Sequence, residues 1–287
     1  MEVLLMYKKV VALYGVPRSG TSWLGQILDS CPDAVYRYQP LFSYRFKNRI
    51  TTESSTDEIE QFFQELYCAD EDDFLNQKEK RISGIYPVFS SKNTDPAILS
   101  YKEARFLYTI PLLIQRYTKI KIVGIIRNPY DVLESWINAP LEFDQEWDIL
   151  EEWNFAAKKN EFRPENYYGY YKWKEYIKLN VEMQKMYPER FITVRYEDLY
   201  QDAINVSKNL FSFLGMPFTD QTEKFIKASQ SKTVSDKYGV YRDKNQEYKR
   251  RYSLPKKVRD RISKDLTGFQ EAKKMGYVPQ CSMQSSS

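Results

Sequence analysis

The feature that most restricts the fold is an apolar run that leads directly into a glycine-containing loop. Lys9–Tyr14 reads KVVALY, a β-branched apolar stretch typical of a buried strand. Gly15–Ser22 (GVPRSGTS) follows as a loop, and Ser22–Ser30 has its apolar side chains at helical spacing. A strand, a glycine-rich turn and a helix in this order place backbone N–H groups at a helix N-terminus. The unit therefore predicts an anion-binding site.

Further apolar strands alternate with helical segments along the chain. The predicted strands are Ala34–Tyr38, Lys121–Ile126 and Phe191–Tyr196. Helices are predicted at 55–66, 102–116, 129–137, 148–160, 165–187, 203–214 and 255–275. This alternation predicts an α/β fold with a parallel β-sheet flanked by helices. Ligands of such sheets bind at the carboxyl ends of the strands, so Gly15–Ser22, Arg127–Ser135 and the stretch after Tyr196 are expected at one edge.

The chain is expected to form a single domain over residues 1–279, followed by a disordered tail at 280–287. No apolar run approaches the ~20 residues of a membrane span, and the N-terminus lacks the basic start of a signal peptide. These features predict a cytoplasmic protein with no membrane partner. The formal net charge of +4 is too small to indicate binding to nucleic acid.

The loop has the G-x-x-x-x-G spacing of a nucleotide-binding P-loop but lacks part of that motif. An NTPase would have Lys after the second glycine, whereas this chain has Thr21 and carries its positive charge within the loop, as Arg18. No apolar strand ends in an Asp suited to holding Mg²⁺. The loop is therefore predicted to hold a phosphate without a metal ion.

A second candidate for anion binding follows the strand Lys121–Ile126. Arg127 comes directly after this strand, and Ser135 lies two turns into the helix that Pro129 opens. A guanidinium with a nearby hydroxyl can hold a phosphate by charge-assisted hydrogen bonds. Two phosphate sites on one sheet edge indicate a nucleotide that is phosphorylated at two separate positions.

Both segments resemble motifs of the sulfotransferases, which use 3′-phosphoadenosine 5′-phosphosulfate (PAPS) as sulfonate donor. Pro17–Ser22 resembles their 5′-phosphosulfate loop, and Arg127–Ser135 resembles their 3′-phosphate motif. Further similarity at Val194–Leu199, Phe213–Pro217 and 254–277 extends over almost the whole chain. The resemblance implies a P-loop-like sulfotransferase fold and metal-independent transfer of sulfonate to a hydroxyl or amine of a glycan or small molecule. It also implies 3′,5′-bisphosphoadenosine (PAP) as product.

The same resemblance implies roles for individual residues. The donor-binding candidates are Pro17, Arg18, Ser19, Gly20, Thr21, Ser22, Arg127, Ser135, Tyr196 and Lys237. Arg18 stands where the cytosolic phenol and steroid enzymes have Lys, which is similar to the carbohydrate and tyrosylprotein branches. Lys102 precedes Arg127 at the spacing of a Lys that contacts the sulfonate in the tyrosylprotein enzymes. Arg18 and Lys102 are therefore catalytic candidates.

The general base is the open question, because the chain contains no His. Gln39 stands where the tyrosylprotein and several carbohydrate enzymes have a Glu base. A neutral amide cannot accept a proton from an alcohol but can position it. Gln39 is therefore a substrate-binding candidate, together with Tyr38 and Phe42.

Three carboxylates are candidates for the base: Glu103, which adjoins Lys102 and is counted with the catalytic residues, and then Glu53 and Glu58. Alternatively, the acceptor is a nitrogen that needs less help in losing its proton.

Two other functions compete with sulfonate transfer. One is a P-loop nucleotide kinase or NTPase; the other is an inactive nucleotide-binding relative, which Gln39 would fit. The region 42–100 is expected to shape the acceptor site.

Overall fold

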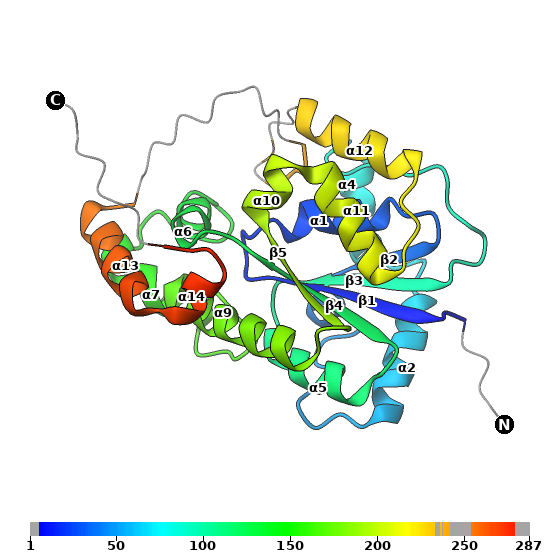
Figure 1. Cartoon of the computed structure of the whole chain (residues 1–287), viewed down its shortest axis with the longest axis horizontal. Coiled ribbons are helices and arrows are strands. Elements are labelled where there is room, and N and C mark those ends of the chain that lie inside the picture. The colour runs from blue at the N-terminus through cyan, green and yellow to red at the C-terminus, as the bar shows by residue number, and fades with distance from the viewer. Residues whose placement is uncertain (1–5, 233–235, 237, 242–253, 279–287) are drawn as a thin grey trace.

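The computed structural model describes residues 6–232, 236, 238–241 and 254–278, and its core is a parallel sheet (Figure 1). The strands are β1 (Lys9–Tyr14), β2 (Ala34–Tyr38), β3 (Ile98–Glu103), β4 (Ile120–Ile126) and β5 (Phe191–Arg195). They are ordered β2-β3-β1-β4-β5, and every neighbouring pair is parallel. All five carboxyl ends therefore meet at one edge, where the sequence analysis expects Gly15–Ser22, Arg127–Ser135 and the stretch after Tyr196.

Helices cover both faces of the sheet (Figure 1). The longer ones are α1 (Thr21–Asp29), α2 (Thr56–Tyr67), α5 (Ile110–Arg116), α6 (Pro129–Ile137), α7 (Ile149–Phe155), α9 (Gly169–Met186), α11 (Ala203–Leu214), α12 (Asp220–Ser231) and α13 (Lys256–Gly268). The shorter ones are α3 (Asp73–Asn76), α4 (Lys78–Ile82), α8 (Ala157–Asn160), α10 (Tyr196–Gln201), α14 (Gln270–Lys274) and the 3₁₀ turns η1 (Pro40–Phe42) and η2 (Leu107–Thr109).

Alternation along the strands separates two apolar cores. In β1, Val11 and Leu13 face the core shared with α1, α11 and α12. Val10, Ala12 and Tyr14 face the core shared with α2, α5 and α9. Because successive side chains of a strand point to opposite faces, a sheet that is buried on both sides requires the continuous apolar run that the sequence shows.

Several elements follow the predicted bounds. The structure has β1, β2 and α11 at the predicted residues, and the capping box Ser55–Glu58 forms at the start of α2. Helix α12 has no counterpart among the predicted elements. The segments predicted as single helices at 148–160 and 255–275 are each divided in two. The first breaks at Ala156, which adopts a φ of 49°, and the second breaks at Phe269.

The prediction of a helix over 102–116 is wrong. Residues 98–103 form β3, a central strand, and the helix α5 begins only at Ile110. The sequence pattern did not indicate this strand, because it contains Lys102 and Glu103, and two adjacent charged residues are rare in a buried strand. In the structure both residues are buried, Lys102 at 2% and Glu103 at 0% relative exposure.

Candidate active site

The loop after β1 requires both of its glycines. A Cβ atom on Gly15 would lie 2.6 Å from Ile125 Cγ2. Gly20 has a φ of +92°, and a Cβ there would lie 2.4 Å from the ring of Tyr196. Both distances are too short for carbon atoms in contact, so the glycines permit the close approach of the loop to β4 and to the start of α10. They bring the start of α1 to the carboxyl edge of the sheet.

The N-terminus of α1 has donors available for an anion. Gly20 occupies the capping position, and no side chain caps the helix. The first N–H groups of a helix have no partner within the helix, and its dipole favours a negative charge there. Ser19 is buried, and its Oγ atom has no hydrogen-bond partner among the described residues. Such a set of donors suits a phosphate group.

The two predicted phosphate motifs are joined directly. Arg18 Nε donates a hydrogen bond of 3.0 Å to Ser135 Oγ, although the residues are 117 positions apart. Arg127 Nη1 donates one of 3.0 Å to the carbonyl of Arg18. The Arg127 guanidinium also lies 4.3 Å above the ring of Tyr196, which is a cation–π contact. Arg18, Arg127, Ser135 and Tyr196 therefore form one cluster.

A group that the sequence did not single out holds the Arg127 segment in place. Glu197 accepts a 2.7 Å hydrogen bond from the Asn128 backbone N–H and a 3.0 Å bond from the Tyr277 hydroxyl. Trp173 Nε1 donates to the Arg127 carbonyl at 2.8 Å. The sequence signal for Glu197 is the segment Val194–Leu199, which contains it without indicating what it contacts.

Lys102 lies at the end of β3, beside the start of α1. Its Nζ atom is 3.4 Å from both Thr21 Oγ1 and Ser22 Oγ, and 4.2 Å from the centre of the Tyr38 ring. Burial lowers the pKa of Lys102 to about 7. A buried amine at a helix N-terminus is well placed to bind an anion, whose charge would favour the protonated form.

Glu103 points to the opposite face of the strand from Lys102, as neighbouring strand residues do. Its Oε1 atom accepts a 2.7 Å hydrogen bond from the Leu41 backbone N–H, and burial raises its pKa to about 8. Its contact thus anchors the turn after β2. Of the other candidate carboxylates, Glu58 belongs to the capping box of α2 and Glu53 is exposed.

The three candidate substrate residues lie at the end of β2, next to Lys102. Gln39 adopts a φ of 42°, and its N–H donates to the Lys102 carbonyl at 2.9 Å. The ring of Tyr38 packs against Phe74 at 5.6 Å. Phe42 is 41% exposed and lies 4.2 Å below the guanidinium of Arg105. An aromatic and cationic surface therefore adjoins the predicted donor site.

One carboxylate near the loop was missed in the sequence. Glu142 Oε1 lies 3.7 Å from Arg18 Nη1. It stands in the segment between α6 and α7, where no motif marks it. The Arg18 guanidinium also lies 5.1 Å from the centre of the Tyr238 ring, whose hydroxyl accepts a 3.2 Å hydrogen bond from the N–H of Leu141, next to Glu142. The predicted donor residue Lys237 lies outside the described residues.

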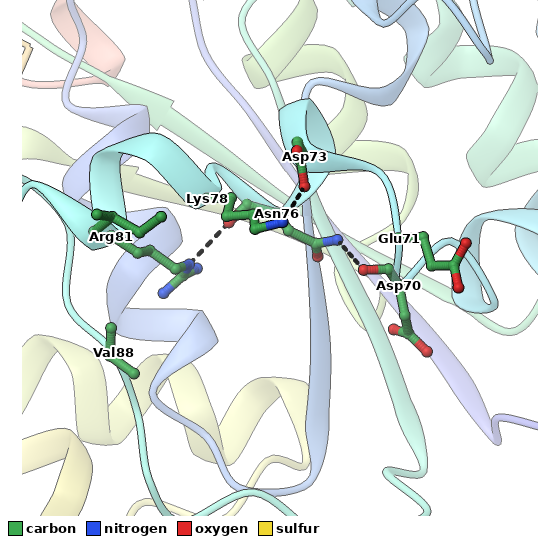
Figure 2. Close-up of a pocket in the computed structure, with 8 residues that line it drawn as sticks. Asp70, Glu71, Asp73, Asn76, Lys78, Arg81 and Val88 are labelled. Atoms are coloured by element: carbon green, nitrogen blue, oxygen red, sulfur yellow. Dashed lines mark hydrogen bonds and ion pairs between the residues drawn. The ribbon is translucent and has the colours of Figure 1, made fainter.

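A surface hollow of about 480 Å³ lies away from this cluster (Figure 2). It is formed by α3, α4 and neighbouring residues. At this hollow, Arg81 Nε donates to the Asn76 carbonyl, and Asn76 Nδ2 donates to the Asp70 carbonyl. None of the predicted donor or catalytic residues lines it.

In the described part of the chain, no helix is both long and apolar enough to cross a bilayer. The expected cytoplasmic location stays a prediction.

Comparison of the sequence with known protein families and curated proteins identifies related proteins. A model described as "Sulfotransferase family" matches residues 11–220. Cytosolic sulfotransferase 14 of Arabidopsis thaliana is 26% identical over 226 residues, which cover 75% of this chain and 56% of that protein. Carbohydrate sulfotransferase 3 of Mus musculus is 24% identical over 155 residues, which cover 52% of this chain and 32% of that protein. The matched region spans about half the length of the first relative and about a third of the second.

Solved structures share the fold. Mouse sulfotransferase SULT7A1 complexed with PAP has a TM-score of 0.56 at 15% identity, covering 94% of this chain and 85% of that one. A sulfotransferase from Alicyclobacillus acidocaldarius has a TM-score of 0.53 at 16% identity, covering 92% and 93%. Such similarity establishes the fold alone. Because the family model covers most of the chain, including most of β1, the glycine loop and the segment Arg127–Ser135, the protein belongs to the sulfotransferase family.

Proposed function

We propose that this protein transfers the sulfonate group of PAPS to a hydroxyl or amine of a small molecule or glycan, without a metal ion. The observation that carries the proposal is the meeting of two anion-binding groups at one sheet edge. Lys102, at the end of β3, lies beside the start of α1, and Arg127 donates to the Arg18 carbonyl in the loop that precedes α1. This arrangement suits a nucleotide with separate 5′ and 3′ charges.

Two buried hydrogen-bond donors that have no acceptor among the described residues support the fit of PAPS. Ser19 Oγ and Arg127 Nε are both buried and have no hydrogen-bond partner among the described residues. Since a buried donor without a partner costs free energy, a ligand that supplies acceptors would relieve that cost. We assign Pro17–Ser22 and Lys102 to the 5′ end of the nucleotide, and Arg127 and Ser135 to its 3′-phosphate. Tyr196, beside Arg127, would lie near the base.

PAPS, when bound, supplies a sulfonate whose leaving group is a phosphate. The contribution of this chain is positioning and electrostatic stabilisation. Arg18, Lys102 and the N–H groups of the loop would stabilise the negative charge that grows on the bridging oxygen. Gln39 and Tyr38 would contact the acceptor because they adjoin Lys102, and Phe42 because its N–H donates to the Gln39 carbonyl. Loss of one charge-stabilising donor typically lowers the rate by about 10²–10³-fold.

Calorimetry with PAP tests the donor site. We expect wild-type protein to bind PAP, and to bind adenosine 5′-phosphosulfate, which lacks the 3′-phosphate, more weakly. Arg127→Ala should remove that preference, whereas Arg163→Ala, at an exposed surface pair with Glu161, should not. Absence of PAP binding to the folded wild-type protein would refute the proposal.

Transfer assays test the activity itself. With labelled PAPS and a panel of alcohols, phenols, amines and glycans, Arg18→Ala and Lys102→Ala should abolish transfer while leaving the protein folded. Turnover of ATP that requires Mg²⁺ would favour a kinase or NTPase instead. Binding of PAP without transfer to any acceptor would favour an inactive relative.

A further inference from the structure

Glu142 occupies a fixed place in the segment between α6 and α7. Its N–H donates to the Ala139 carbonyl at 2.9 Å, and its own carbonyl accepts from Trp136 Nε1 at 3.1 Å. The adjacent Phe143 packs edge-on against Trp136 at 5.1 Å, and both rings are buried. The backbone of Glu142 is therefore held by the core, and its side chain is directed toward Arg18.

The two carboxylate oxygens of Glu142 have different surroundings. Oε1 lies 3.7 Å from Arg18 Nη1. Oε2 is shielded from solvent and has no hydrogen-bond partner among the described residues. A buried carboxylate oxygen without a donor costs free energy, so such groups are uncommon unless they serve a purpose. Oε2 has the capacity to accept a proton.

Glu142 also lies close to both sides of the predicted reaction site. Burial has the largest effect on the pKa values of Lys102, Tyr38 and Tyr168. The negative charge of Glu142 acts to raise the pKa of each of these three groups. Lys102 belongs to the predicted donor side, and Tyr38 to the predicted acceptor side. The charge of Glu142 therefore acts on residues of both sides, and its direct contact with the glycine loop is the 3.7 Å approach to Arg18.

The carboxylates considered from the sequence are placed less well. Glu103 is on the other face of β3 and accepts from the Leu41 N–H, and its raised pKa of about 8 keeps it protonated at neutral pH. Glu58 is occupied in capping α2, and Glu53 is exposed. Gln39 cannot accept the proton.

We propose that Glu142 is the general base that accepts the proton of the acceptor hydroxyl, an inference that rests on the proposed sulfonate transfer. In this step the acceptor oxygen forms a bond to sulfur. The bond between sulfur and the bridging oxygen breaks, and its electron pair leaves with PAP. The acceptor proton passes to the carboxylate of Glu142, whose side chain is 20% exposed. No metal or redox partner is needed for the balance.

A purely structural role makes a different prediction for donor binding. If Glu142 served only to position Arg18, its neutralisation would weaken binding of PAP. If it is the base, its negative charge opposes the binding of an anion beside Arg18. Glu142→Gln should then bind PAP at least as tightly as wild type. Glu146→Gln, an exposed carboxylate of the same segment, is the matched control.

Transfer from PAPS to two probe acceptors completes the test. Benzyl alcohol keeps its proton until a base removes it, whereas p-nitrophenol is largely ionised in mildly alkaline buffer. Glu142→Gln should lower transfer to benzyl alcohol by about 10²–10⁴-fold and change transfer to p-nitrophenol by less than about threefold. Glu146→Gln should resemble wild type with both.

The outcomes separate the two proposals. Failure of wild-type protein to bind PAP would refute the sulfotransferase proposal itself. With PAP binding intact, weaker PAP affinity in Glu142→Gln, or equal losses with both acceptors, would overturn the role of Glu142 as base. If neither probe is accepted, weaker binding of PAP by Glu142→Gln would still overturn the role of Glu142 as base.

Discussion

At the scale of single residues, Lys102 combines a stability cost with a proposed role in donor binding. Burial lowers its pKa from 10.5 to about 7. Between these two values the unfolded chain holds a proton that the native protein lacks, so this group lowers stability progressively as the pH falls from about 10.5 to about 7. An anion beside Lys102 would reverse the balance by favouring the charged amine.

Lys102→Met should therefore separate stability from binding. We expect the variant to unfold at a higher temperature than wild type, with a gain of about 1–2 kcal/mol at neutral pH, and to bind PAP at least tenfold more weakly. In wild type, PAP binding should take up a proton at pH values above about 7, and affinity should fall as the pH rises. Calorimetry in buffers of different ionisation enthalpy measures this uptake, and Lys102→Met corrects for the phosphates' own titration. Equal proton uptake in both proteins would contradict the assignment.

Gly20 provides a second prediction at this scale. Gly20→Ala would place a Cβ 2.4 Å from the Tyr196 ring in a residue with φ +92°. We expect it to lower stability by more than about 2 kcal/mol and to abolish PAP binding, because the loop must shift. Gly84→Ala is the control, since Gly84 has a φ of +72° but nothing within 4 Å of an added Cβ. Gly84→Ala should lower stability by only about 1 kcal/mol and leave PAP affinity unchanged. Similar losses of stability in the two variants would show that the positive φ, and not the contact with Tyr196, accounts for the effect.

At the scale of elements, Arg37 shows how β2 holds the segment that follows α2. The side chain is 4% exposed and donates to the carbonyls of Leu66 and Tyr67, to Asn76 Oδ1, and to Asp70 Oδ1 at 2.6 Å. It thus satisfies carbonyls at the C-terminal end of α2 that the helix itself leaves free. One buried guanidinium connects the sheet to the segment that leads into α3.

Arg37→Met should accordingly destabilise the protein by about 3–5 kcal/mol, because it leaves buried acceptors without a donor. Arg49→Met removes a two-bond Arg–Glu65 pair whose side chains are more than 30% exposed. That control should cost less than about 1 kcal/mol. Chemical denaturation measures both values. A loss of similar size in the two variants would show that the burial of Arg37 contributes little.

The same scale shows why the sequence predicted some elements and missed others. β1, β2 and the loop Gly15–Ser22 are local patterns, in which apolar runs and glycines act on their own neighbours. β3 was missed because Lys102 and Glu103 are charged, and their burial depends on α1 and the Leu41 turn. Glu142 was missed because its contact with Arg18 joins segments more than a hundred residues apart. The residue types of a site can be predicted locally, but its cross-chain contacts cannot.

At the scale of the whole molecule, the C-terminal segment supports the predicted 3′-phosphate site. Tyr277, which is 3% exposed, donates to Glu197, and Glu197 accepts from the Asn128 N–H. Arg127 precedes that amide directly. Glu197 from α10 and Tyr277 from the end of the described chain therefore help to fix the position of the Arg127 segment, which follows β4.

Tyr277→Phe should lower PAP affinity by about two- to fivefold, because the Arg127 segment loses part of its support while the ring packing against Trp173 remains. Affinity for adenosine 5′-phosphosulfate, which has no 3′-phosphate, should stay unchanged. Tyr170→Phe is the matched control, since its hydroxyl bonds to Asp265 instead. An equal loss for both nucleotides would show that Tyr277 acts on overall stability, whereas a loss confined to PAP would link the C-terminal segment to recognition of the 3′-phosphate.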